Sequence, residues 1–334
     1  MSNPTLRPLC SLVVLTYNRP ERLVERLNEI VPHMKIYPIE CLVISNGSPN
    51  DLTSIINAFP LVEFVVNDYN IGLSGSFFSA FRKSRGQFTW IVSDDDILNV
   101  ESAMKFLMTE TGRAPHYVSQ WNLPIQTSQS VSELEMLAGL SNQIFLTSAA
   151  RDAINQLANE INPTYPQILL SIVLGFKFSR LPFPLFTDLG VTKDYSAAAA
   201  FKVHIRDKVL LTRQCRKLNS QVEWIRAIDS WAISNLLNYS LVQFGEHATN
   251  GSRQHHAKRL RHLLRVSPPR IRLLITFMVM GLEVWGLLPP PIRNYSLRKL
   301  ISFVNPQLIV TLDGYPYEES LISAYPDYDS DKRH

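Results

Sequence analysis

Short apolar runs alternate with helical periodicities over the first 120 residues, and each run ends in a polar cluster. The runs span residues 12–16, 41–44, 62–66 and 88–92, and the first is of the kind that suits a strand buried on both faces. Apolar residues at helical spacing follow the first run, at Leu23, Leu27, Ile30 and Val31. Strands that alternate with helices in this way indicate βαβ units with right-handed crossovers. The sequence therefore predicts an α/β fold with a mostly parallel, Rossmann-like sheet.

The polar residues that follow these strands are the strongest indication of a binding site. The clusters are Thr16-Tyr17-Asn18-Arg19, Asn46-Gly47-Ser48, Asn67-Asp68-Tyr69-Asn70 and Ser93-Asp94-Asp95-Asp96. Turns are rich in Asn, Gly, Ser and Asp, so turn chemistry alone explains any one cluster. The carboxyl ends of parallel strands, however, meet at one edge of a sheet, where ligands bind in α/β proteins. Four clusters at that edge predict one shared site.

Asp94, Asp95 and Asp96 place three consecutive carboxylates at the end of a buried strand. Such a cluster is costly to keep ionised without a counter-charge. Mg²⁺ or Mn²⁺ supplies that charge, prefers oxygen ligands and would neutralise the charge that develops on a departing nucleotide. The alternative is a solvated acidic turn in which Asp96 or Asn99 caps the next helix. The buried strand before the cluster favours the metal site.

The same segments resemble the ordered signature of the family 2 glycosyltransferases. The residues that carry the resemblance are Leu15 to Pro20, Ser45 to Ser48, Asn70 to Gly72 and Ser93 to Asp96. The family has the GT-A fold, and its DXD motif binds a divalent metal and a nucleotide-sugar. Within the family the chain looks closest to the abequosyltransferase-like and O-antigen or capsule enzymes.

This resemblance is close over residues 9–110 and looser beyond them. It implies a GT-A domain at residues 1–245, with a nucleotide-sugar-binding half at 1–120 and an acceptor half at 121–245. A basic, partly amphipathic helical extension is expected at 246–334. From the residues alone, 150–175 and 222–243 are expected to be helical, 122–135 to be a loop, and 178–192 to be irregular.

Carried over position by position, the resemblance implies a donor site built from all four clusters. Its nucleotide-sugar-binding residues would be Thr16, Tyr17, Asn18, Arg19, Asn46, Asn70, Gly72, Asp94 and Asp95. The metal ligands would be Asp94 and Asp96, with His247 as a further ligand unless it is a surface histidine.

One position departs from the family pattern. The second strand of the family usually ends in an acidic pair, of which the second acid contacts the base, whereas this chain has Ser45-Asn46. An Asn side chain still offers both a donor and an acceptor to a pyrimidine edge. Sugars of UDP, dTDP and CDP all remain candidate donors.

A catalytic base is expected well downstream of the carboxylates. Inverting members of the family use an Asp or Glu there to deprotonate the acceptor hydroxyl. The family's usual Glu-Asp pair is absent, and the candidates are Asp188, Asp194, Glu223 and Asp229. Asp229 lies in a predicted helix flanked by tryptophans, and Asp188 follows an aromatic loop suited to stacking on a sugar. We place Asp229 first and Asp188 second; a helix cap or a surface ion pair is the alternative for each.

Two groups of cations complete the sequence features. Arg82, Lys83 and Arg85 end the third predicted helix, where a solvated helix end is favoured over contact with a donor phosphate.

Seven further cations lie between residues 253 and 272, beside the apolar segment 271–288. This combination is typical of a helix in the membrane interface, and a helix packed on the catalytic domain is the alternative. No nucleic-acid-binding motif accompanies the basic run, so no nucleic-acid partner is expected.

The predicted function is therefore a metal-dependent, inverting glycosyltransferase that moves a sugar from a nucleotide-sugar to a glycan. The expected acceptor is a polyprenyl-diphosphate-linked glycan of lipopolysaccharide O-antigen or another surface polysaccharide. Three widely spaced cysteines and the absence of a recognisable signal peptide favour the cytoplasm, with a peripheral position on the inner face of the membrane. The alternatives are a catalytically inactive nucleotide- or glycan-binding scaffold and a sugar nucleotidyltransferase, although the glycine-rich loop of the latter is missing.

Overall fold

The computed structural model contains two compact units. It describes residues 7–47, 51–110, 112–119, 134, 136–157, 162, 164–188, 205–218, 221–246, 260–265 and 267–285. The first unit comprises residues 1–193 and 214–228, and the second comprises 194–213 and 229–334. This division differs from the predicted boundary at residue 245, which remains a prediction.

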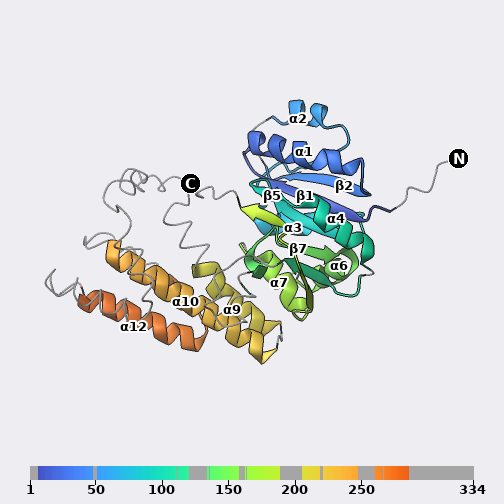
Figure 1. Ribbon diagram of the computed structural model, residues 1–334. Helices are drawn as coiled ribbons and strands as arrows, with labels where there is room; N and C mark the ends of the chain where they lie inside the picture. Colours follow the sequence, from blue (N-terminus) through green and yellow to red (C-terminus); the bar gives the residue numbers. More distant parts are fainter. Residues whose placement is uncertain are drawn as a thin grey trace. The chain divides into compact units, whose positions relative to one another are not determined.

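The first unit is built on a sheet flanked by helices (Figure 1). The sheet has seven strands in the order β3-β2-β1-β4-β7-β6-β8. The strands are β1 (Cys10–Thr16), β2 (Ile39–Ser45), β3 (Glu63–Val66), β4 (Phe88–Ser93), β6 (His116–Ser119), β7 (Gln143–Leu146) and β8 (Phe178–Leu181). β1 to β4 are parallel to one another, β7 is antiparallel to β4 and to β6, and β8 is parallel to β6. The predicted α/β fold with a mostly parallel sheet is confirmed.

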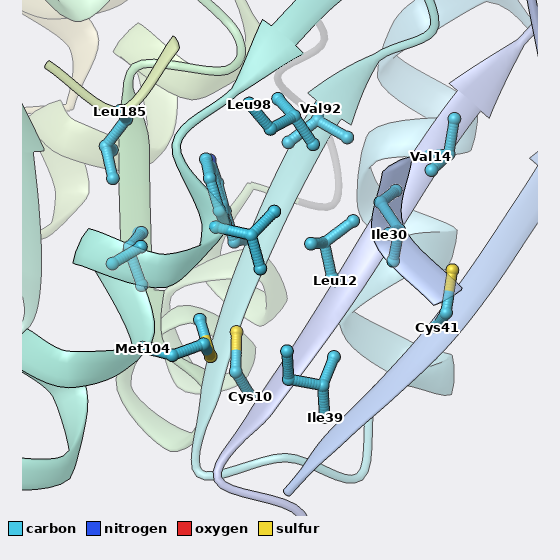
Figure 2. Close-up of a cluster of buried hydrophobic side chains, with 14 of the residues drawn as sticks. Cys10, Leu12, Val14, Ile30, Ile39, Cys41, Val92, Leu98, Met104 and Leu185 are labelled. Atoms are coloured by element: carbon cyan, nitrogen blue, oxygen red, sulfur yellow. The ribbon is translucent and has the colours of Figure 1, made fainter. Parts of the chain in front are cut away.

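Helices cover both faces of this sheet, which explains why its central strands β1, β2 and β4 are almost completely buried. Helices of this unit include α1 (Pro20–Met34), α2 (Thr53–Ala58), α3 (Gly72–Lys83), α4 (Val100–Thr109), α6 (Thr147–Gln156) and α7 (Pro166–Val173). On one face, alternate residues of β1 pack with residues of α1 and α4 in the core drawn in Figure 2. On the other face, Phe77 and Phe81 of α3 make edge-to-face contacts with Phe145 of β7. Burial on both faces fixes the sheet and hence the positions of its strand ends.

The segment 178–192 was expected to be irregular, and this prediction is wrong for its first part. β8 occupies Phe178–Leu181, and β9 (Phe186–Asp188) pairs antiparallel with the short strand β5 (Asp96–Leu98). Strands of three or four residues are too short to display an alternating pattern, and their partners lie far away in the sequence. Pairing with distant strands therefore determines structure here that local periodicity does not reveal.

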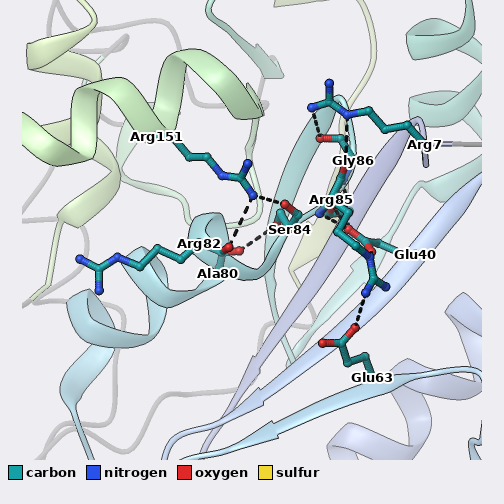
Figure 3. Close-up of polar contacts among 10 residues, drawn as sticks. Arg7, Glu40, Glu63, Ala80, Arg82, Ser84, Arg85, Gly86 and Arg151 are labelled. Carbon is teal, nitrogen blue, oxygen red and sulfur yellow. Dashed lines mark hydrogen bonds and ion pairs between the residues drawn. The ribbon is translucent and has the colours of Figure 1, made fainter.

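A polar network lies at the opposite edge of the sheet, where the strands begin (Figure 3). The buried carboxylate of Glu40 accepts hydrogen bonds from the Ser11 hydroxyl, the Gly86 N–H and the Arg85 side chain, whose Nε lies 2.7 Å from it. Arg85 also pairs with Glu63 at 3.0 Å. Arg151 donates to the Phe81 carbonyl at the end of α3 (2.8 Å). Arg85 and Arg151 therefore stabilise the edge away from the four clusters, and Arg85 is paired with Glu40 and Glu63, whereas the sequence predicted only a solvated helix end.

The second unit is helical in its described part. It contains much of α9 (Asp207–Lys217) and α10 (Val222–Glu246), together with α12 (Pro269–Trp285). Its core includes Val209, Ala232, Leu236, Leu263, Ile271, Ile275 and Val279. The Lys208 ammonium lies 4.1 Å from the centre of the Trp231 ring and donates to Asn235 at 2.7 Å. Among the described residues, no helix is both long enough and apolar enough to cross a membrane.

His116 is a buried titratable group in the sheet, and it makes stability depend on pH. Its ring lies against Phe145 and Phe178, with centroid distances of 5.2 and 5.4 Å, and within the described structure neither ring nitrogen has a hydrogen-bond partner. Burial lowers the pKa of His116 from 6.5 to about 3. The folded-state pKa thus lies below the unfolded one, so stability present above pH 6.5 is lost as the pH falls towards 3.

We expect His116 to lower the free energy of unfolding by up to about 1.4 kcal/mol per pH unit in this window. His116→Phe should remove that slope and, because it deletes two unsatisfied buried nitrogens, stabilise the protein at pH 7 by about 1–3 kcal/mol. Urea unfolding of both proteins between pH 7 and 4 measures the difference. Equal slopes for the two proteins would contradict the prediction.

Candidate functional site

The predicted clusters lie together at the carboxyl edge of the sheet. β1 to β4 run parallel, so the residues that follow them lie at the same edge. Hydrogen bonds link neighbouring strand ends: the Asn46 N–H donates to the Thr16 carbonyl, and the Asn67 N–H to the Ser45 carbonyl, each at 3.0 Å. The expected convergence of the clusters is thus present, although Ser48 lies outside the described residues.

The turn after β1 brings a hydroxyl and a guanidinium onto the carboxylates. Asn18 has a positive φ of 56°, a conformation that Asn tolerates better than most residues, and α1 begins directly afterwards at Pro20. The Thr16 hydroxyl donates to Asp94 Oδ2 at 2.6 Å. One nitrogen of Arg19 lies 3.0 Å from an oxygen of Asp94 and 3.0 Å from an oxygen of Asp95. Thr16 and Arg19, from the cluster after β1, therefore hold Asp94 and Asp95, from the cluster after β4.

Asp96 is held by Ser141, a residue that the sequence analysis did not identify. The Ser141 hydroxyl donates to Asp96 Oδ2 at 2.5 Å and accepts from the Ser93 N–H at 2.9 Å. Its carbonyl accepts from the Trp90 indole at 2.8 Å, which fixes the serine against β4. Ser141 lies two residues before β7, and no motif or periodicity marks it. Only the pairing of β7 with β4 brings it to the carboxylates.

Ser141→Ala should destabilise the protein by about 1–3 kcal/mol, because the Ser93 N–H and one oxygen of Asp96 lose a buried partner. Ser76→Ala is a matched control: Ser76 is equally buried, but its hydroxyl has no hydrogen-bond partner in the described structure. That variant should be neutral or slightly stabilised. Chemical denaturation of the three proteins gives the comparison, and equal effects of the two substitutions would contradict the assigned contacts.

Asn46 and Asn70 form a second part of the site, and their amides are largely engaged with the protein. Asn46 donates to Asn70 Oδ1 at 2.7 Å and accepts from the Ile71 N–H at 2.9 Å. Asn70 Oδ1 also accepts from the Gly72 N–H at 2.8 Å, which fixes the start of α3. Gly47 is required here, because a Cβ at this position would lie 2.2 Å from the Tyr69 backbone. Asn46 therefore orders the loop that contains Asn70, and an N–H of its amide remains for a ligand.

The carboxylates are buried, and this burial determines their electrostatics. Asp94 is 3% exposed, and Asp95 and Asp96 are each 8% exposed. Burial raises the pKa of Asp94, the Thr16 hydrogen bond and the Arg19 charge lower it, and the Asp95 charge raises it again; the net shift is upward. Ionised carboxylates in this position are short of positive charge.

The donor set fits a hard divalent cation. Carboxylate oxygens from Asp94 and Asp96 are ligands that Mg²⁺ and Mn²⁺ prefer, and a cation would offset the desolvation of Asp94. In the part of the chain that the structure describes, no three His, Cys, Asp or Glu side chains form a complete metal-binding group. Remaining ligands would come from water and from a nucleotide diphosphate, as is usual for Mg²⁺. His247 lies outside the described residues.

The candidate bases have different positions in the structure. In the β5–β9 ladder, Asp188 is paired directly with Asp96. Opposed residues of antiparallel strands have Cα atoms about 4.5–5.5 Å apart, so the backbone of Asp188 lies beside the carboxylates. Asp229 lies on α10 and belongs to the second unit. Glu223 is exposed in the first turn of α10, and Asp194 lies outside the described residues.

Comparison with known proteins gives a family match over the first part of the chain. Residues 11–117 match the model of the family described as Glycosyl transferase family 2, a segment that contains all four clusters and covers about a third of the chain. No curated protein sequence matches the chain significantly.

Similar solved structures extend the comparison to most of the chain. The crystal structure of S. aureus TarS 1-349 has 16% sequence identity and a TM-score of 0.55, covering 80% of this chain and 86% of that one. The same TarS fragment in complex with UDP-GlcNAc has 15% identity and a TM-score of 0.56, with the same coverage. The mannosyltransferase PcManGT from Pyrobaculum calidifontis in complex with GDP-Man and Mn²⁺ has 13% identity and a TM-score of 0.48, covering 85% and 88%.

Together the fold and the family match define the class. The chain has the GT-A fold, and residues 11–117 match a glycosyltransferase family, so the predicted enzyme class, glycosyltransferase, is confirmed. The prediction of a family 2 enzyme agrees with the match over this segment. Closeness to the abequosyltransferase-like or O-antigen enzymes is not among these findings and remains a prediction.

Proposed function

We propose that this chain is a metal-dependent, inverting glycosyltransferase that moves a sugar from a nucleotide-sugar to a glycan acceptor. The observation that carries the proposal is the buried cluster Asp94–Asp96, which is held by Thr16, Arg19 and Ser141 at the carboxyl edge of the sheet. Preorganised oxygens of this kind cost little reorganisation when a charged ligand binds. A solvated acidic turn, the alternative, would leave these side chains exposed rather than buried.

Each part of the site has a role in this reaction. Asp94 and Asp96 would hold Mn²⁺ or Mg²⁺, and that ion would supply positive charge to the nucleotide diphosphate as it departs. Arg19 orients Asp94 and Asp95 and, being half-exposed, can also reach a phosphate. Tyr17 and Tyr69 are exposed in the clusters that follow β1 and β3, and their rings are suited to stacking on a base. Asp188 is our choice for the base that takes the proton of the acceptor hydroxyl, supported by its pairing with Asp96.

A thermal-shift screen tests this proposal. UDP-, dTDP-, CDP- and GDP-sugars are each added with Mn²⁺ and with EDTA; UDP-GlcNAc comes first, because the similar TarS fragment was solved with it. We expect one nucleotide to stabilise the protein in the presence of metal only, by about 2.7 kcal/mol at a hundredfold excess over Kd. No shift with any donor would contradict the proposal. Metal-dependent binding without turnover of the donor in the presence of glycan acceptors would favour the inactive scaffold.

A lipid-linked acceptor is supported by the exposed face of α12. Leu273, Phe277 and Met280 lie on one face of this helix and are 60%, 62% and 55% exposed, although large apolar side chains are usually buried. Its opposite face packs into the core of the second unit through Ile271 and Ile275. The exposed cations Arg261, Arg265 and Arg272 lie in the same segment. We propose that this face contacts an anionic membrane surface on the cytoplasmic side, where a polyprenyl-diphosphate-linked glycan would be the acceptor.

Vesicle sedimentation tests the membrane proposal. The protein should bind phosphatidylglycerol vesicles more tightly than phosphatidylcholine vesicles, and Phe277→Ser should weaken this binding. Met108→Ser is the matched control, because Met108 is 61% exposed on α4 of the first unit. Equal binding to both kinds of vesicle, or an equal loss for both variants, would contradict the proposal.

A further inference from the structure

Arg26 is a buried cation on an otherwise apolar face of α1. It is 3% exposed and lies among Leu23, Leu27 and Ile30, the other buried residues of this helix. Removing a guanidinium from water is costly unless charged or hydrogen-bonding partners compensate. An apolar residue would fill such a position at lower cost, so the arginine needs a reason that packing does not supply.

The contacts of Arg26 lead to the strand that carries Asp96. Arg26 forms an ion pair with Glu29 one turn later, and Glu29 Oε1 accepts a hydrogen bond from the Leu98 N–H at 2.8 Å. Leu98 ends β5, the three-residue strand that begins at Asp96. Arg26 and Glu29 therefore connect the first helix to the backbone of the carboxylate cluster.

Arg26 also interacts electrostatically with the cluster. Burial is the largest effect on the pKa of Arg26 and makes the net shift downward, whereas the negative charges of Asp96, Glu25, Asp94 and Asp95 act in the opposite direction. Arg19 is in direct contact with Asp94 and Asp95, but it is half-exposed, so solvent screens its charge more. A buried charge acts through a lower effective dielectric and is screened less.

We propose that Arg26 is a positioning residue: it is the internal counter-ion of Asp94–Asp96 and, through Glu29, it holds β5 in place before any ligand binds. The counter-ion role concerns the protein alone, whereas its benefit for metal binding rests on the function proposed above. Arg26 does not need to touch the substrate. Its part is to keep three carboxylates close together at a site that is otherwise short of positive charge.

A ligand-free double-mutant cycle tests the counter-ion role. Arg26→Met should raise the equilibrium constant for unfolding by about a hundredfold or more, because it leaves buried negative charge without compensation. Asp96→Asn removes one of those charges. The equilibrium constant for unfolding of the double variant should therefore be at least tenfold smaller than the product of the two single effects predicts. Arg22→Met is the matched control, since Arg22 forms the same kind of pair with Glu25 one turn earlier, at 3.0 Å on the exposed side of α1. Its effect should be small and simply multiply with that of Asp96→Asn.

The outcomes decide the counter-ion role without any ligand. Multiplicative effects in the Arg26 cycle would overturn it. If Arg26→Met alone does not fold, the Asp96→Asn background decides: the double variant must fold for the proposal to stand, and a double variant that is equally unfolded overturns it.

Mn²⁺ affinity, measured from the electron spin resonance signal of free Mn²⁺, tests positioning separately. Removal of a nearby cation would by charge alone tighten Mn²⁺ binding, whereas loss of positioning should weaken it. We expect Arg26→Met to raise the Kd about tenfold and Arg26→Lys, which keeps the charge, to recover part of the loss. Tighter binding by Arg26→Met would overturn the positioning role. A wild-type protein that binds no Mn²⁺ would instead contradict the proposed function and leave the ligand-free cycle to decide on Arg26.

Discussion

Replacing Asp188 with Asn should lower kcat by about 10²–10⁴-fold and leave donor binding nearly unchanged. An Asn of the same shape cannot take the proton of the acceptor hydroxyl, and loss of a general base affects the chemical step rather than the binding of the nucleotide-sugar. Pairing with Asp96 in the β5–β9 ladder keeps the backbone of residue 188 beside the carboxylates in the variant. Steady-state kinetics give kcat, and the thermal shift with donor and Mn²⁺ gives binding.

Asp229→Asn separates the two candidates for the base. This variant should retain kcat within about tenfold if Asp188 is the base, since the loss of a catalytic base costs at least 10²-fold. The reverse result, a large loss of kcat for Asp229→Asn and a small one for Asp188→Asn, would make Asp229 the base. That result would agree with the sequence analysis, which placed Asp229 first. Large losses in both variants with normal donor binding would assign both carboxylates to the acceptor half of the reaction.

The sequence predicted the strands that appear as continuous apolar runs, and the site residues that directly follow these strands. Apolar runs with both faces buried identified β1, β2 and β4 to within a few residues, and a parallel sheet necessarily aligns the ends of its strands. Asp94 and Arg19 could therefore be assigned to one site, although 75 positions separate them. Motif residues at strand ends are predictable because the backbone alone determines where they lie.

The remainder of the site depends on pairing between distant segments. Ser141 reaches Asp96 because β7 runs antiparallel beside β4, and Asp188 is paired with Asp96 because β9 is a partner of β5. Short antiparallel strands of this kind have no periodicity of their own. Arg26 was overlooked for a different reason. The helix contains two arginine–glutamate pairs at the same spacing, Arg22–Glu25 and Arg26–Glu29, and both are typical of an exposed helix surface in the sequence. Only the structure shows that Arg26 is buried.

Asp96→Asn should lower kcat/KM by about 10³-fold or more and abolish the effect of Mn²⁺ on nucleotide binding. The metal is expected to contribute several kcal/mol of charge stabilisation to the departing diphosphate, and about 4 kcal/mol corresponds to 10³-fold. Asn keeps the size of the side chain and can still bond to Ser141, so the fold should be maintained. EDTA should inactivate the wild-type protein, with full recovery on addition of Mn²⁺, whereas the variant should stay inactive in both conditions.

The pH dependence of Mn²⁺ binding is a second measure of the same site. Burial raises the pKa of Asp94, and a protonated carboxyl must release its proton before it binds a metal. Affinity should therefore rise with pH, by up to about tenfold per unit below the folded-state pKa of Asp94, and level off above it. Asp152→Asn, an exposed change on α6, should preserve both the affinity and this profile. Should Asp96→Asn instead keep wild-type activity that EDTA still removes, the metal would bind elsewhere, and the Asp94–Asp96 cluster would serve the fold and the nucleotide rather than the ion.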